Sequence, residues 1–115
     1  MTSLDIAQLY FNLSNKSDLE AIGALFDEST TYVSPTMGTF KGKKVILVMQ
    51  QAFHDKFTTL HSQVNSVEEV EPDVFLFEYT FKGELPDKEA ILSSGLEYIS
   101  VRNDKILHVE IKNKR

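Results

Sequence analysis

The sequence predicts an α+β fold in which three N-terminal helices pack on one face of a strongly bent, mostly antiparallel sheet. Up to residue 57 apolar residues recur mainly at helical spacing, whereas from residue 58 the hydrophobic period changes from 3.6 to 2 and stays there. The later segments are joined by short connections, and short connections imply antiparallel neighbours. Helices followed by a run of strands are typical of an α+β plan, with the helices on one face of the sheet.

Two short helices open the predicted fold. Ser3 followed by Asp5 is typical of a helix start, and Asp18 can cap a second helix after a break at residues 15–17. The apolar positions of the first helix are Leu4, Ile6, Ala7, Tyr10, Phe11 and Leu13. Those of the second helix are Leu19, Ile22, Leu25 and Phe26. The two helices therefore meet at one turn.

A short strand and a third helix follow. Residues 30–33 are β-branched or aromatic and lead into Pro35, which predicts a strand that ends at the proline. Residues 36–42 contain two glycines and predict a loop or a small hairpin. Residues 43–57 predict a helix with a polar face that includes Gln50 and His54. Its apolar stripe is expected to consist of Val45, Val48, Met49, Ala52, Phe53 and Phe57.

Four long strands complete the fold, at residues 58–70, 74–82, 90–102 and 106–112. Alternation on the second of these strands places four aromatic side chains on one face, which predicts the inner face: Phe75, Phe77, Tyr79 and Phe81. The last strand turns Val109 to the same side. On the third strand, Glu97 shares the inner face with small or apolar residues such as Gly95 and Ile99. A carboxylate at that place is unusual and marks a candidate site.

Composition limits the classes of function. The 115 residues are 42% hydrophobic and 25% charged, which predicts one domain over residues 1–115. The absence of cysteine excludes thiol catalysis and fits a reducing compartment, so the cytoplasm is the expected location. A net charge of −5 argues against nucleic acid as a partner. No segment has the length or the charge pattern of a membrane span or a signal peptide, so no membrane partner is expected.

Three stretches of the chain carry a family resemblance. Residues 15–26 read N-x-x-D-L-x-x-I-x-x-L-F and lead into a strand that ends at Pro35, residues 38–42 read G-x-F-x-G before an apolar helix, and the closing strands read E-Y-I-S-V-R-N-D-K-I-L-H-V-E-I. In these features the chain resembles the SnoaL-like branch of the nuclear transport factor 2-like superfamily. This superfamily has a cone-shaped fold that ketosteroid isomerases share. The resemblance implies that fold and a pocket, but no single reaction, because the superfamily holds isomerases, dehydratases, cyclases, epoxide hydrolases and non-catalytic members.

The resemblance also implies roles for three residues. Tyr10 falls where the steroid isomerases place a tyrosine that hydrogen-bonds the developing oxyanion, and Glu97 falls close to their second donor, a protonated acid. Ser34 falls where they carry the aspartate base. A serine hydroxyl cannot accept a proton near neutral pH without a partner base, so we expect no 3-ketosteroid isomerase activity.

The combined prediction is a small apolar ligand in the cone, with Tyr10 and Glu97 as donors or acid/base groups of an isomerase, dehydratase or cyclase. The expected wall consists of Phe53, Phe75, Phe77, Tyr79, Tyr32 and Val109. Desolvation is expected to raise the pKa of Glu97, although a structural carboxylate bonded to tyrosine or backbone groups is the alternative. For Tyr10 the alternative is simple packing. The alternative for the whole protein is a non-catalytic binding or dimerisation module whose pocket is filled by side chains.

The remaining predictions concern histidines and assembly. His54 and His61 are expected to be solvated, and no histidine shows metal-ligand spacing, so neither a metal nor a cofactor is expected. The outer face of the third long strand is half apolar, which predicts a homodimer through the outer sheet face. His108, on the outer face of the last strand, would lie in that interface.

Overall fold

The structure, a computed structural model that describes residues 1–114, contains three α-helices and one six-stranded sheet in this part of the chain. The helices are α1 (Ser3–Asn15), α2 (Leu19–Gly23) and α3 (Lys43–His54). The strands are β1 (Thr31–Ser34), β2 (Gly38–Lys41), β3 (Thr59–Glu71), β4 (Val74–Glu84), β5 (Ala90–Arg102) and β6 (Lys105–Asn113). The α+β prediction is confirmed. None of the helices in the described part has the length and apolar character needed to span a lipid bilayer.

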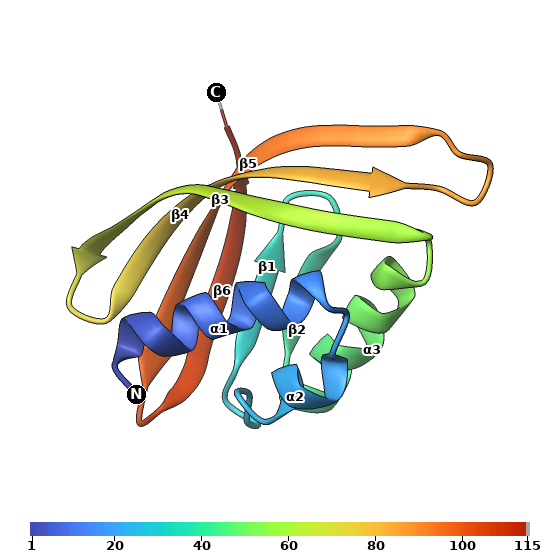
Figure 1. Cartoon of the computed structure of the whole chain (residues 1–115). Coiled ribbons are helices and arrows are strands. Elements are labelled where there is room, and N and C mark those ends of the chain that lie inside the picture. The colour runs from blue at the N-terminus through green and yellow to red at the C-terminus, as the bar shows by residue number, and fades with distance from the viewer. Residues whose placement is uncertain (115) are drawn as a thin grey trace.

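The sheet has the strand order β2-β1-β6-β5-β4-β3. Only the pairing of β1 with β6 is parallel, and the other four pairings are antiparallel. The register shifts twice between β3 and β4 and once between β5 and β6. Such irregularities bend and twist a sheet, and Figure 1 shows the sheet curving over the three helices, which all lie inside the bend.

Local signals account for the helix ends. The Thr2 hydroxyl accepts a hydrogen bond from the Asp5 N–H at 3.1 Å while the Asp5 carboxylate accepts one from the Thr2 N–H, so α1 begins with a capping box one residue before the predicted start. Asp18 caps α2 as predicted, because its carboxylate accepts from the Ala21 N–H. α2 ends at Gly23, earlier than its apolar pattern suggests, yet Leu25 and Phe26 are buried in the turn beyond it.

The buried face of α3 differs from the predicted stripe. Val45 and Val48 are 52% and 68% exposed, whereas Ile46 and Gln50 are buried. Both sides of this helix carry apolar residues, so packing decides which side is covered. On the covered side of α3, the Leu47 side chain packs on Gly23 of α2. A Cβ atom added at Gly23 would lie 2.9 Å from the Leu47 Cδ1 atom. Gln50 therefore lies inside the protein, and the prediction that it lies on the polar, solvent-facing side of the helix was wrong.

The core fills one part of the space between α1, α2 and the sheet. Phe77 of β4 and Ile99 of β5 are fully buried there, and the Phe11 ring of α1 lies 4.7 Å from the Phe77 ring, centroid to centroid. The inner faces predicted for β4 and β5 are confirmed. Because α1 covers only part of the long strand β4, the rest of its inner face is left for a cavity.

Candidate functional site

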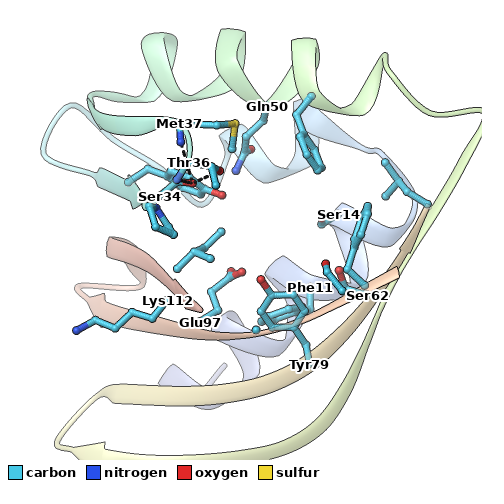
Figure 2. Close-up of a pocket in the computed structure, with 18 of the residues that line it drawn as sticks. Phe11, Ser14, Ser34, Thr36, Met37, Gln50, Ser62, Tyr79, Glu97 and Lys112 are labelled. Atoms are coloured by element: carbon cyan, nitrogen blue, oxygen red, sulfur yellow. Dashed lines mark hydrogen bonds between the residues drawn. The ribbon is translucent and has the colours of Figure 1, made fainter. Parts of the chain in front are cut away.

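A cavity of about 330 Å³ lies between α1, α3, the β1–β2 hairpin and the inner faces of β4 and β5. Its walls are largely aromatic or apolar: Tyr10, Phe11, Tyr32, Phe53, Tyr79 and Phe81 are among the lining residues. This volume is at the lower end of the range for small-molecule pockets. Figure 2 shows Glu97 and Tyr79 pointing into the open space from the sheet and Gln50 approaching from α3.

Glu97 is the only carboxylate among the residues that line the cavity in the described structure. Its side chain comes from the inner face of β5, and the residue is 6% exposed. Burial raises the pKa of Glu97 from 4.5 to about 8, with desolvation as the cause. Neither a hydrogen-bond donor nor an opposite charge lowers that pKa. The side chain is therefore mostly a neutral acid at pH 7, and its carboxyl group is free to bond a ligand.

Three tyrosines surround this carboxyl group. Burial raises the pKa of Tyr10 and Tyr32 well above the ordinary value, and the nearby Glu97 charge raises both further. Burial and Glu97 together raise the pKa of Tyr79 to about 12. All three hydroxyl groups consequently keep their protons at neutral pH, so they can serve as hydrogen-bond donors.

The Tyr79 ring can lie over β5 because Gly95 has no side chain. Gly95 is the register partner of Tyr79 on β5, and a Cβ atom there would lie 2.7 Å from the Tyr79 hydroxyl oxygen. The ring thus lies across β5 toward the position of Glu97, two residues further along the same face. A glycine in the middle of this strand makes room for a pocket side chain.

Tyr10 is held by a polar partner on α3. The Gln50 Nε2 group donates a hydrogen bond to the Tyr10 hydroxyl oxygen at 2.8 Å, and both residues are buried. Because the Tyr10 oxygen accepts this bond, its own proton remains available. The Gln50 Oε1 atom has no hydrogen-bond partner in the part of the chain that the structure describes. Burying an amide costs free energy because the group loses its hydrogen bonds to water, and the bond to Tyr10 offsets part of this cost.

Ser34 has a structural role in the β1–β2 hairpin. Its hydroxyl oxygen accepts hydrogen bonds from the backbone N–H groups of Thr36 and Met37, each at 3.3 Å, and lies 3.2 Å from the Thr36 hydroxyl. These bonds fix the turn that follows Pro35. No titratable partner contacts Ser34 in the described residues, so the hydroxyl lacks an activating base.

Comparison with protein families decides the relationship of the chain. A model described as a SnoaL-like domain matches residues 7–109. The chain belongs to this SnoaL-like family. The match covers most of the chain, including Tyr10, Ser34 and Glu97, and it confirms the resemblance found in the sequence. No curated protein matches the SnoaL-like chain at a significant level.

Solved structures of the same fold are distant in sequence. A hypothetical protein with a ketosteroid isomerase-like fold from Catenulispora acidiphila DSM 44928, in complex with trimethylamine, superposes with a TM-score of 0.85 at 16% identity over 98% of this chain and 88% of that chain. A proposed SnoaL-like polyketide cyclase from Shewanella putrefaciens CN-32 gives 0.83 at 9% identity over 97% and 90%. An LEH-like epoxide hydrolase from M. tuberculosis gives a TM-score of 0.82 at 9% identity over 95% of this chain and 80% of that chain. Similarity at this level establishes the fold of the SnoaL-like domain and leaves its reaction open.

The structure brings together part of the predicted site. Tyr10, Glu97, Ser34, Tyr32, Phe53 and Tyr79 all line the cavity of this SnoaL-like domain. Phe75, Phe77 and Val109 do not line it. They are fully or almost fully buried in the core beneath α1, because only the far part of the inner face of β4 borders the cavity. Their side chains shape the sheet that carries the site.

The histidines divide between the cavity and the outside. His61 is exposed, as expected, and is absent from the cavity wall. The prediction that His54 is solvated was wrong, because the end of α3 packs on the turn after α1: the ring is half-buried at the cavity wall, and its Nδ1 atom lies 2.9 Å from the Ser17 hydroxyl oxygen. Burial lowers the pKa of His54, so the ring is neutral at pH 7. His108 lies on the outer sheet face between the Thr31 hydroxyl and the Glu110 carboxylate.

Gln50 is the residue that sequence reasoning missed. It lies four residues after Ile46 and three before Phe53, which is the spacing of one helix face. An amide on a face otherwise made of core residues was the signal that could have found it.

The bond between Tyr10 and Gln50 gives a testable coupling. Tyr10→Phe leaves the buried Gln50 amide without a partner, so we expect it to lower the free energy of unfolding by about 1–3 kcal/mol. In the Gln50→Leu background the same change should have little effect, because no amide is left unpaired. Urea unfolding of the four proteins measures the coupling. Tyr98→Phe, on the outer face, is the control, and equal losses in both backgrounds would contradict the assignment.

Proposed function

We propose that this SnoaL-like protein binds a small, largely apolar molecule in the cavity and hydrogen-bonds an acceptor atom of that molecule, such as a carbonyl oxygen. The observation that carries the proposal is the Glu97 carboxyl group, which is 6% exposed at a cavity wall and has no hydrogen-bond or ion-pair partner among residues 1–114. Buried polar groups normally have a partner, so one without a protein partner indicates a place for a ligand.

The donors are suited to stabilising negative charge on such an oxygen. Neutral Glu97 and Tyr10 each carry a proton that no described residue accepts, and both line the cavity. Donors fixed in a desolvated site stabilise charge that develops on a carbonyl oxygen during proton removal from the neighbouring carbon. The chemistry that this supports is an isomerisation, dehydration or cyclisation with Tyr10 and Glu97 as donor or acid/base groups.

The alternative is a non-catalytic module whose pocket is filled by side chains, and such a module would have no open cavity. A cavity of about 330 Å³ with converging polar groups supports the ligand-binding reading. Binding without catalysis remains as the second candidate, favoured by Ser34, which is committed to a turn where related isomerases carry a base. Turnover measurements on bound ketones separate the two.

Binding of cyclohexanone, a small ketone, tests the proposal by thermal shift. A ligand at about 100 times its dissociation constant adds about 2.7 kcal/mol of stability, which a melting curve resolves. Tyr10→Phe and Glu97→Leu each remove one donor and should weaken binding, whereas Tyr98→Phe, outside the cavity, should leave it unchanged. Equal shifts in all four proteins would show that the donors do not bind the ketone.

The protein is expected not to convert a β,γ-unsaturated 3-ketosteroid to its conjugated isomer. Enolisation needs a base as well as donors, and general base catalysis commonly supplies about 10² to 10⁴ in rate. Ser34→Asp places a carboxylate where Ser34 accepts two backbone N–H bonds, a turn that aspartate also supports, and should raise any trace activity if the cavity admits a steroid. Ultraviolet absorbance follows the reaction. Efficient turnover by the unmodified protein would show that another residue acts as base.

A homodimer through the outer sheet face is part of the proposal. Leu92 is 71% exposed there, and Leu96 and Tyr98 are only partly covered on the face that the helices do not reach. Light scattering in the tens of micromolar range should give twice the chain mass. Leu96→Asp should yield a monomer and Val48→Asp, on the exposed side of α3, should not. A monomer for the unmodified protein would contradict this assembly.

A further inference from the structure

We propose that the cavity also binds a small organic ammonium ion, as the counter-charge of the Glu97 carboxylate, with the aromatic walls packed around its methyl or methylene groups. The inference rests on the proposed function only in using the same cavity. It adds a second ligand class, which is recognised by the charged form of the carboxyl group instead of the neutral form.

The first observation is a carboxylate without a counter-charge. The ion pairs of the described residues join His108 and Lys112 to Glu110, and Lys114 to Glu78, and none includes Glu97. Lys112 is the only lysine or arginine among the lining residues of the described structure. Its Nζ atom lies 3.7 Å from the Glu110 carboxylate and 5.7 Å from the Tyr98 ring centre, on the outer sheet face, and Figure 2 shows it extending away from Glu97. A buried charge of this kind is stable only when a partner compensates it.

The second observation is the nature of the wall. Tyr10, Tyr32 and Tyr79 are close enough to the carboxyl group for its charge to act on all three. Phe11, Phe53 and Phe81 complete the aromatic lining. Aromatic faces attract cations within about 6 Å of the ring centre, and the attraction is stronger where water is excluded. A carboxylate inside such a wall favours an organic cation over a hydrated metal ion, which would need more oxygen ligands.

The third observation concerns what else could change charge in the cavity. The tyrosine hydroxyls from α1, β1 and β4 have a raised pKa and stay neutral up to about pH 9. His54 from α3 has a lowered pKa and is neutral above pH 7. Lys112 of β6 is held on the outer face by Glu110 and Tyr98. Between pH 7 and 9 the charge inside the cavity therefore depends on Glu97.

This dependence gives the two ligand classes opposite pH profiles. An ammonium ion pairs with the ionised carboxylate, whose pKa in the free protein is about 8. The apparent affinity for a permanently charged ammonium should therefore rise with pH, on the order of a hundredfold between pH 6 and pH 9, and level off above the pKa. A ketone held by the protonated acid should bind more weakly over the same range.

Choline and its uncharged isostere 3,3-dimethyl-1-butanol test the inference by isothermal titration calorimetry. The two molecules have nearly the same shape, so the difference between them reports on charge. Choline should bind more tightly with rising pH, and the alcohol should show no such rise. Glu97→Gln should abolish the preference for choline, and Glu68→Gln, at an exposed position of β3 outside the cavity, should retain it. A choline affinity that is independent of pH, or equal to that of the alcohol, or unchanged in Glu97→Gln, would overturn the inference.

A measurement on the unmodified protein tests the inference even if the Glu97→Gln variant does not fold. Carboxyl NMR follows the titration of Glu97 with and without choline. Because the cation stabilises the ionised form, choline should lower the observed pKa of this group from about 8, and an unchanged pKa would overturn the inference. If cyclohexanone binds and choline does not, the ammonium inference fails while the proposed function stands. If neither molecule binds, both fail.

Discussion

The free energy of unfolding is expected to fall as the pH rises from about 4.5 to about 8, and Glu97→Gln is expected to remove most of this fall. Burial holds the pKa of Glu97 at about 8 in the folded protein, whereas the unfolded chain titrates near 4.5. Between these values the folded state binds one proton more than the unfolded state. Raising the pH therefore favours unfolding, by about 1.4 kcal/mol for each pH unit.

Urea unfolding at several pH values across this window measures the slope. Above about pH 8 both states have lost the proton, so the contribution of Glu97 levels off. At the alkaline end the glutamine variant should be the more stable protein, because a neutral amide replaces a carboxylate that must ionise in the cavity. Glu68→Gln, at an exposed position of β3, should retain the slope. Parallel pH profiles for the unmodified protein and Glu97→Gln would show that the carboxyl group is hydrated.

Strand pattern and caps were sufficient to predict most of the fold. Alternation along β4 and β5 assigned the inner face correctly. The pattern is informative because shifting a strand by one residue would turn all of its apolar side chains to the other face of the sheet. Turn residues placed the breaks between strands. Sequence did not predict the covered face of α3, since valines on the exposed side resemble core residues as closely as Ile46 does. Tertiary contacts decide the face, among them the close approach of Leu47 to Gly23 and the bond between Gln50 and Tyr10.

The sequence predicted Glu97 and Tyr10 as residues of the candidate site but did not predict Gln50, which hydrogen-bonds Tyr10. Glu97 stood out because a carboxylate interrupts an apolar row, and Tyr10 because of its place in the family pattern. Gln50 was missed because amides usually lie at the surface, and its role depends on a bond to Tyr10 across 40 positions of sequence. Contacts over such separations are set by how the helices pack on the sheet, which periodicity does not report.

Both proposed ligand classes depend on one carboxyl group in two protonation states. A pKa of about 8 lies within one unit of neutral pH, so both forms are populated there. The neutral acid can donate to an acceptor atom, and the ionised acid can bind a cation. No hydrogen-bond partner among residues 1–114 has to be released when Glu97 gains or loses its proton.

Phe77→Ala is expected to destabilise the protein by about 3–5 kcal/mol and to change ligand binding in the folded protein less than a change in the cavity wall does. Phe77 is fully buried, its ring packs 4.7 Å from that of Phe11, and it does not line the cavity. Removing the ring therefore creates a void in the core beneath α1, where close-packed neighbours relax only in part.

Phe81→Ala provides the matched comparison on the same strand and the same face. Phe81 is half-buried, packs on Phe53 at 5.8 Å between ring centroids, and lines the cavity. Its loss should cost less stability, because less surface is buried, yet it should change the affinity for cyclohexanone, because the ring forms part of the wall. Urea unfolding and the ketone thermal shift together separate the two roles. If Phe77→Ala altered binding and Phe81→Ala did not, the boundary between core and cavity would lie elsewhere along β4.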